Sequence, residues 1–273
     1  PVPGYDRHFA ITEYFGFQLI PIETNEEGPD MDAVEEWVKD PSVKGIWCVP
    51  KYSNPEGITY SDAVVKRMAA LRPAAKDFRI FWDNAYVIHD LTDTPDHLDD
   101  ILSLAAEYDN EDMFFMFTST SKISFPGSGL AAIASSEKNI KRITKELAFQ
   151  TIGYDKLNQL RHAKLFPTKE AIHEHMVHHR NLIKPKFDAV LEEFDKQGID
   201  KLEGVTFTRP NGGYFISLNL PEGCAKRLVS LAADAGLALT AAGATFPYGK
   251  DPLDNNIRIA PTFPPLEDIK KAA

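Results

Sequence analysis

The chain has 273 residues, of which 43% are hydrophobic and 26% are charged, the composition of an ordinary globular protein with room for one large or two smaller domains. Its formal net charge of −10 argues against a nucleic-acid-binding surface, which is normally basic, and no apolar stretch approaches the roughly 20 residues of a membrane helix. Cys48 and Cys224 are too few for a disulfide scaffold, so we expect a reduced, cytoplasmic protein without nucleic-acid or membrane partners.

The first half of the chain alternates short apolar runs with amphipathic segments. Asp30 and Ser61 are suitable N-caps for two helices, since each precedes apolar residues at helical spacing. We predict strands at 17–22, 45–50, 78–82, 112–118 and 129–135, with the middle three buried, and helices that begin near Asp30, near Ser61 and at 96–106. This alternation is typical of βαβ units, so we expect an α/β fold with a mostly parallel sheet.

The second half begins with three predicted helices, at about 137–150, 155–165 and 168–197. A hairpin follows, in which two alternating runs flank Asn211-Gly212, a dipeptide typical of tight hairpin turns. A helix near 223–236 and a strand at 256–259 complete a smaller α/β unit. We place the domain boundary inside the long helix, which gives domains 1–180 and 181–273.

Polar side chains follow three of the predicted strands. Asn54 comes after the first of them, Asp83 and Tyr86 after the second, and Lys122 ends a Ser/Thr-rich turn after the third. Because parallel α/β sheets bind ligands outside the carboxyl ends of their strands, we expect these groups to converge at one edge. An amine, a carboxylate, an amide, a phenol and hydroxyls together suit a phosphorylated pyridine aldehyde, with which the amine can form a Schiff base.

Five motifs occur in order along nearly the whole chain. They are Ser53-Asn54-Pro55-Glu56-Gly57, Asp83-Asn84-Ala85-Tyr86, Ser119-Thr120-Ser121-Lys122 with Pro126-Gly127 after it, Gly212-Gly213-Tyr214-Phe215 and Ile257-Arg258-Ile259. Together they resemble the fold-type I pyridoxal-phosphate aminotransferases, and the segments 3–9 and 155–162 resemble the bacterial aspartate-aminotransferase-like subgroup. The resemblance implies a mostly parallel, seven-stranded-type sheet in a major domain that binds pyridoxal 5′-phosphate, and a smaller C-terminal α/β domain.

The resemblance implies catalytic roles for three residues. Lys122 would form the Schiff base and move the proton at the substrate Cα, while Asp83 would keep the pyridine nitrogen of the cofactor protonated. Tyr86 and Asn54 would donate hydrogen bonds to the phenolate oxygen of the ring. The Asn54-Pro55 bond is a candidate cis peptide.

Further residues are assigned to cofactor or substrate binding by the same resemblance. Ser119 and Ser121 would bind the phosphate, although a solvated turn also explains them. Tyr5 would stack on the ring, or it is a core aromatic residue. Arg258 and Asn54 would bind the substrate. Arg258 would hold its α-carboxylate, since a guanidinium forms two parallel hydrogen bonds with a carboxylate; a surface ion pair is the alternative for Arg258.

The implied reaction is transamination between an amino acid, aspartate-like by resemblance, and a 2-oxo acid in a homodimer. Another pyridoxal-phosphate reaction, such as a lyase or decarboxylase, stays open, as does a ligand-sensing domain of a transcription regulator. Lys156 or Arg161 is a candidate for binding a distal carboxylate, although surface pairing explains both equally well.

Two features depart from the family pattern. The segment 123–130 has no arginine to bind the phosphate, and the chain begins after the phosphate loop and N-terminal arm of the family, so we expect an internal piece of a longer enzyme.

No metal is expected, because the His173-Glu174 pair would need histidine rather than Val177 to match the zinc-protease helix. We therefore interpret His175 and His179 as part of a solvated helix face.

Overall fold

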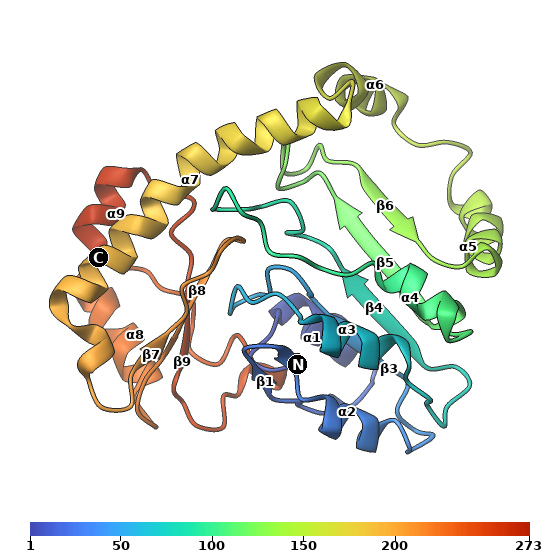
Figure 1. Ribbon diagram of the computed structural model, residues 1–273. Coiled ribbons are helices and arrows are strands. Elements are labelled where there is room, and N and C mark those ends of the chain that lie inside the picture. The colour runs from blue at the N-terminus through green and yellow to red at the C-terminus, as the bar shows by residue number, and fades with distance from the viewer.

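A four-stranded sheet lies at the centre of the computed structural model, which describes residues 1–273 (Figure 1). In spatial order its strands are β3 (Gly45–Cys48), β4 (Arg79–Asp83), β5 (Phe114–Ser119) and β6 (Ala131–Ala134). The first three run parallel, as predicted, whereas β6 pairs antiparallel with β5. The carboxyl ends of the three parallel strands therefore meet at one edge of the sheet.

The main core covers only one face of this sheet. Ile80, Trp82 and Phe114 are fully buried there, whereas Phe81 and Phe115 point to the opposite face and stay partly exposed. Three helices pack on the buried face: α2 (Met31–Trp37), α3 (Asp62–Ala69) and α4 (Ile101–Glu107). The burial predicted for whole strands is thus wrong for every second residue, because successive side chains of a strand point to opposite faces.

The helices on the core face begin where acidic or hydroxyl side chains cap them. Asp30 accepts hydrogen bonds from two backbone N–H groups of the first turn of α2, and Ser61 accepts one from α3, as predicted. The third helix starts at Ile101 rather than at 96, because Asp100 is its cap. Asp96 is instead engaged by the side chains of Thr59 and Asn211.

Two predictions near the start of the chain are wrong. The segment 17–22 forms no strand, since Pro21 has no backbone N–H for a ladder, and the nearby strands are the two-residue pair β1 (Thr24–Asn25) and β2 (Gly28–Pro29). Conversely, α1 (Asp6–Tyr14) was not predicted. Its preceding residue, Tyr5, offers no side-chain cap, so the usual signal of a helix start is missing.

The second half contains the three predicted helices in sequence. They are α5 (Glu137–Gln150), α6 (Lys156–Leu165) and the long α7 (Lys169–Gln197), whose C-terminal half packs against α9 (Leu266–Ala272) and a three-stranded sheet. That antiparallel sheet comprises β7 (Thr206–Phe207), β8 (Ile216–Asn219) and β9 (Asn256–Ile259), and α8 (Ala225–Asp234) lies beside it (Figure 1). Short 3₁₀ turns are η1 (Glu111–Met113), η2 (Ile199–Lys201) and η3 (Pro247–Gly249). None of the helices offers an apolar run sufficient to cross a bilayer.

The Asn211-Gly212 segment does not form the predicted tight turn, although β7 and β8 do pair antiparallel. It extends away from that pair and bonds to the first half of the chain, where Asn211 accepts from the backbone of Leu91. Gly212 lies against the ring of Tyr52, and a Cβ at this position would approach the ring to 1.9 Å. The segment therefore ties the two halves of the chain together beside the strand ends. The domain boundary near residue 180 stays a prediction.

Candidate active site

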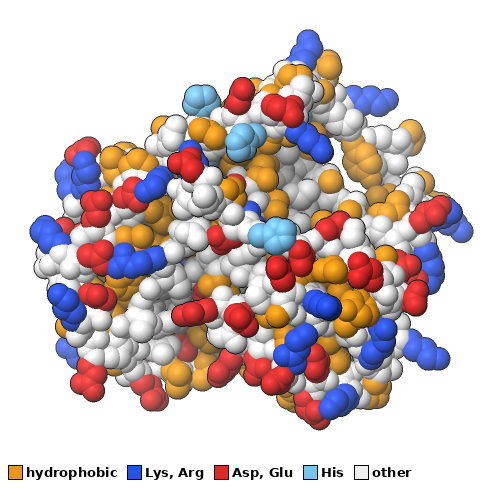
Figure 2. Space-filling model, viewed as in Figure 1, with side chains coloured by type: hydrophobic (Ala, Val, Ile, Leu, Met, Phe, Trp, Pro, Cys, Tyr) orange, Lys and Arg blue, Asp and Glu red, His pale blue; other side chains and the backbone are white.

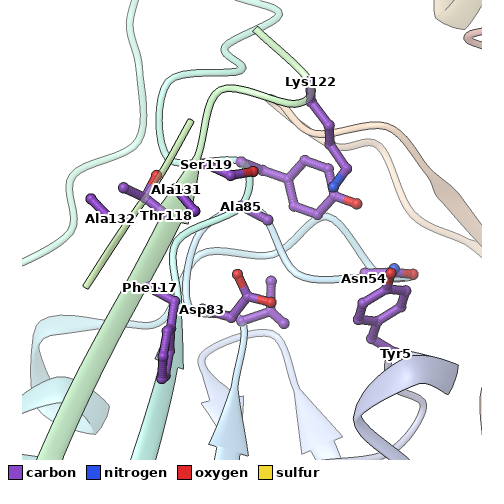
Figure 3. Close-up of a pocket in the computed structure, with 12 residues that line it drawn as sticks. Tyr5, Asn54, Asp83, Ala85, Phe117, Thr118, Ser119, Lys122, Ala131 and Ala132 are labelled. Carbon is purple, nitrogen blue, oxygen red and sulfur yellow. The ribbon is translucent and has the colours of Figure 1, made fainter. Parts of the chain in front are cut away.

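A cavity of about 290 Å³ opens where the three parallel strands end. Six residues that the sequence marked as candidates line it together: Tyr5, Asn54, Asp83, Tyr86, Ser119 and Lys122 (Figure 3). Figure 3 shows Lys122 entering from the turn after β5, with Asp83 rising from the end of β4 and Asn54 beside Tyr5 across the cavity. Candidate groups that are far apart in the chain therefore share one small space.

Lys122 is partly buried, and its ammonium nitrogen lies 5.0 Å from the centre of the Tyr86 ring. Burial lowers the pKa of Lys122, and the negative charge of Asp83 partly opposes that change. The amine is therefore neutral more often than a solvated lysine, which favours its action as a nucleophile or a base.

Asp83 ends β4 on the sheet face opposite the main core. His8, on α1, places its Nε2 atom 3.0 Å from Asp83 Oδ2, and the imidazole stacks on Trp47 with a ring distance of 4.3 Å. A carboxylate only accepts hydrogen bonds, so Nε2 of His8 carries the shared proton. His8 is buried and was missed by the sequence analysis; its place three residues after Tyr5, one helical turn away, was the available signal.

Tyr86 and Asn54 form another wall of the cavity. Both are buried, and burial raises the pKa of Tyr86, which keeps its hydroxyl a donor. The Asn54-Pro55 peptide is cis, as predicted. Arg258 of β9 donates from Nη1 to Asn54 Oδ1 at 3.1 Å, which brings a guanidinium from the second half of the chain next to the cavity wall.

Arg258 is held from several sides but retains a free donor. It lies 3.6 Å from the carboxylate of Asp6, and its guanidinium carbon is 4.9 Å from the centre of the Phe215 ring. Its Nε atom is buried and has no hydrogen-bond partner. A buried donor without a partner is costly, so this atom is suited to an additional acceptor such as a carboxylate.

The two serines proposed for phosphate binding are placed differently. Ser119 lines the cavity, whereas Ser121 does not and packs against Gly129, where an added Cβ would lie 2.7 Å from its Oγ. The lining contains no arginine, and Lys122 is its only cationic residue. On the face shown in Figure 2, acidic and basic side chains are interspersed.

His175 and His179 do not form a solvated helix face, and that prediction is wrong. His175 Nε2 lies 2.7 Å from the carbonyl oxygen of Ile123, and His179 Nε2 lies 3.0 Å from the hydroxyl of Tyr214. That hydroxyl donates to the carbonyl oxygen of Lys122 at 3.1 Å. The amphipathic pattern of the helix could not reveal these contacts, because the partners come from a distant turn.

Another histidine, His89, contacts the Lys122 carbonyl group directly. His89 Nε2 lies 3.2 Å from the Lys122 carbonyl oxygen, and burial lowers the pKa of His89 to about 4. Burial also raises the pKa of Tyr214 to about 12. Both side chains are therefore neutral donors at neutral pH, and the backbone of the lysine is held without placing another charge beside its amine.

The whole chain, residues 1–273, matches the family described as aspartate amino-transferase. It is 51% identical over 274 residues to a Mycolicibacterium smegmatis protein provisionally named an aminotransferase, a match that covers 100% of this chain and 64% of that protein. It is 47% identical over 272 residues to the aspartate aminotransferase of Corynebacterium glutamicum, covering 100% of this chain and 63% of that protein. The chain thus spans a little under two thirds of the length of these relatives.

Solved structures agree with this match. A crystal structure of an aspartate transaminase from Corynebacterium glutamicum has a TM-score of 0.97 at 47% sequence identity, covering 100% of this chain and 64% of that one. The α-aminoadipate aminotransferase of Thermus thermophilus, at 24% identity and a TM-score of 0.81 over 99% of this chain and 67% of that one, has the same fold. From its sequence match and its structure, the chain belongs to the aspartate amino-transferase family.

Proposed function

We propose that this chain forms the cofactor- and substrate-binding part of a pyridoxal-phosphate-dependent aminotransferase, which exchanges an amino group between an amino acid and a 2-oxo acid. The observation that carries the proposal is the convergence of Lys122, Asp83, Tyr86 and Asn54 on one cavity at the strand ends. The names of the relatives support the same activity.

The side chains of the cavity fit pyridoxal phosphate. They offer one amine for an aldehyde, one carboxylate for a pyridine nitrogen, and a phenol with an amide for a ring oxygen; in the phosphate region, Ser119 and the backbone amides of its turn are the available donors. A fold relative, the Thermus thermophilus enzyme, was crystallised with a phosphopyridoxyl derivative of leucine. When bound, pyridoxal phosphate supplies an electron-withdrawing ring that makes the Cα proton of an amino acid acidic.

The residues of the chain supply proton transfer and orientation. Lys122 would hold the cofactor through its ε-amino group and, once that amine is free, take the proton from the substrate Cα; its lowered pKa favours the unprotonated base. Asp83, oriented by His8, would hold the proton on the pyridine nitrogen. Tyr86 and Asn54 would donate to the ring oxygen, which keeps negative charge there.

Arg258 would bind the α-carboxylate of the amino acid. The side chain already lies against Asn54, and its unpartnered Nε atom offers a second donor in the plane of the guanidinium. Relatives named aspartate aminotransferase favour an aspartate-like substrate. Lys156 and Arg161 are exposed and do not line the cavity of this chain, so we assign neither of them to a distal carboxylate.

A second copy of the chain is the partner that we propose. The surface from the end of α5 through α6 exposes six large apolar side chains, an amount typical of an interaction surface: Phe149, Ile152, Tyr154, Leu157, Leu160 and Leu165. Apolar side chains are visible in this region in Figure 2. In sedimentation velocity the intact protein should form a dimer that Ile152→Asp weakens; a monomer at micromolar concentration would contradict this.

Both cysteines are free, which fits a reduced, cytoplasmic setting.

The transamination proposal is tested by a half-reaction in the intact protein. With pyridoxal phosphate bound, addition of aspartate alone should convert the cofactor to its amine form, seen by absorbance, and release a 2-oxo acid; 2-oxoglutarate should reverse the change. An amine without an α-carboxylate should react more slowly, since it cannot use Arg258. Absence of a half-reaction with any amino acid would exclude transamination, and release of carbon dioxide would indicate a decarboxylase instead.

A further inference from the structure

The helix α6 is attached to the molecule by polar rather than apolar side chains. Its only buried residues are Asn158 and His162, which lie one helical turn apart, while its leucines face solvent. Both residues belong to the segment 155–162, whose resemblance to the bacterial subgroup carries no chemical role in the function proposed above. Buried polar side chains are costly unless they are hydrogen-bonded, so their partners indicate what the helix does.

Asn158 binds the far end of the turn that carries Lys122. Its amide nitrogen donates to the carbonyl oxygen of Ser128 at 2.7 Å and to that of Gly129 at 3.3 Å. Ser128 and Gly129 lie just before β6, separated from its first residue by Leu130, where the chain returns to the sheet.

His162 binds the near end of the same turn. Its Nδ1 lies 2.9 Å from the carbonyl oxygen of Asn158, so this nitrogen carries a proton and donates. In neutral His162 the other nitrogen, Nε2, is therefore an acceptor, and it lies 2.9 Å from the Thr120 hydroxyl and 2.8 Å from the Ser124 hydroxyl. In the sequence, Lys122 lies between Thr120 and Ser124, two residues from each.

Hydrogen bonds within the turn also join its two ends, close to the residues that α6 contacts. Thr120 and Leu130 exchange two hydrogen bonds, one between their backbones and one from the Leu130 N–H to the Thr120 hydroxyl. Across the turn, Gly129 lies so close to Ser121 that a Cβ would come within 2.8 Å of its backbone nitrogen. Opening either end would therefore displace the backbone from which the Lys122 side chain extends.

We propose that Asn158 and His162 are positioning residues, and that together they hold the turn 120–130 closed and so fix where the amine of Lys122 points. The catalytic role of the two residues rests on the proposed function. Their role in holding the turn closed rests on the hydrogen bonds alone. The two side chains hold opposite ends of the turn from one rigid helix, which is how a scaffold keeps a reactive group in place.

The test compares His162→Ala, His162→Gln and Asn158→Ala with the unaltered intact protein. Hydrogen exchange by mass spectrometry should be about tenfold faster or more in peptides covering 120–130 of the two alanine variants, since each loses buried hydrogen bonds. The rate at which borohydride traps pyridoxal phosphate on Lys122 should fall about tenfold in the same variants. In His162→Gln the amide oxygen can accept from the two hydroxyls, so most of both losses should be recovered.

Gln159→Ala, an exposed neighbour on the same helix, is the matched control and should change neither measurement. Unchanged exchange in the alanine variants, or a His162→Gln variant as impaired as His162→Ala, would overturn the inference. If the helix variants fail to fold, Ser124→Ala removes one contact from the opposite side and should act in the same direction, and no effect there would count against the proposal. Failure to trap cofactor on Lys122 in the unaltered protein would reject the proposed function, while the exchange measurement would still decide whether the turn is held by α6.

Discussion

Amino-group transfer is expected to fall at least about 1,000-fold when Lys122 is replaced by alanine, because in the proposed function the variant loses both the group that attaches the cofactor and the base that moves the Cα proton. Lys122→Arg should be almost as inactive, since a guanidinium keeps the charge but neither condenses with an aldehyde nor loses its proton at neutral pH. The measurement is single-turnover absorbance of the aspartate half-reaction, with borohydride trapping as a second readout.

Lys141→Ala provides the matched control for this experiment. Lys141 is an exposed helix residue that pairs with Glu137, so its loss should leave the half-reaction and the trapping unchanged. Mass mapping of the trapped cofactor should locate it on Lys122 alone. Trapping of similar yield in Lys122→Ala would show that another lysine reacts, and the assignment of the cavity would then be wrong.

The polar residues of the cavity that come from the sheet edge were predictable because each lies at or just after the end of a parallel strand. Asp83 directly ends β4, and Asn54 and Lys122 lie on the turns that follow β3 and β5, so the topology alone brings them to one edge. The helix caps Asp30 and Ser61 were predictable for a similar reason, since a cap acts within one turn of its own position. Local rules and a simple topology therefore account for most of the predicted residues that line the cavity.

The residues that hold the cavity in place were not predictable, because their partners are distant in the chain. His8 meets Asp83 across 75 residues, and His175 meets the carbonyl oxygen of Ile123 across 52. A histidine at such a position has the same helical spacing as a solvated one, so the pattern predicts exposure. Burial and a hydrogen bond to a backbone group appear only when the turn and the helix are placed together.

The predicted antiparallel pair forms as β7 and β8, but the connection between them is not the tight turn that the dipeptide indicated, for a related reason. Asn-Gly is typical of a two-residue turn, but here Gly212 is needed for contact with the Tyr52 ring, and the segment pairs with the backbone near His89. Tyr214 and Phe215 follow this segment in the sequence. The Tyr214 hydroxyl donates to the Lys122 carbonyl oxygen, and the Phe215 ring lies against the Arg258 guanidinium. A local turn signal was thus overridden by a tertiary contact that serves the site.

Replacing Asp83 with asparagine should change catalysis and lysine reactivity in opposite directions. Asparagine has nearly the same shape but no charge, so it cannot hold a proton on the pyridine nitrogen, and we expect the aspartate half-reaction to slow about 100- to 1,000-fold, as for the loss of a preorganised electrostatic contact. The negative charge of Asp83 raises the pKa of Lys122, against the stronger lowering by burial. Its removal should therefore lower that pKa further.

The consequence for Lys122 has a defined sign. A lower pKa means that more of the amine is neutral at a given pH, so in the protein without cofactor the labelling of Lys122 by an amine-reactive reagent should become faster in Asp83→Asn, with its pH profile shifted to lower pH. Asp234→Asn, an exposed change of the same kind on α8, should alter neither rate. A variant in which labelling and transfer both slow would indicate a disordered cavity, whereas faster labelling with slower transfer separates the charge of Asp83 from its contribution to shape. Only the second result agrees with a carboxylate that faces both the amine and the ring nitrogen.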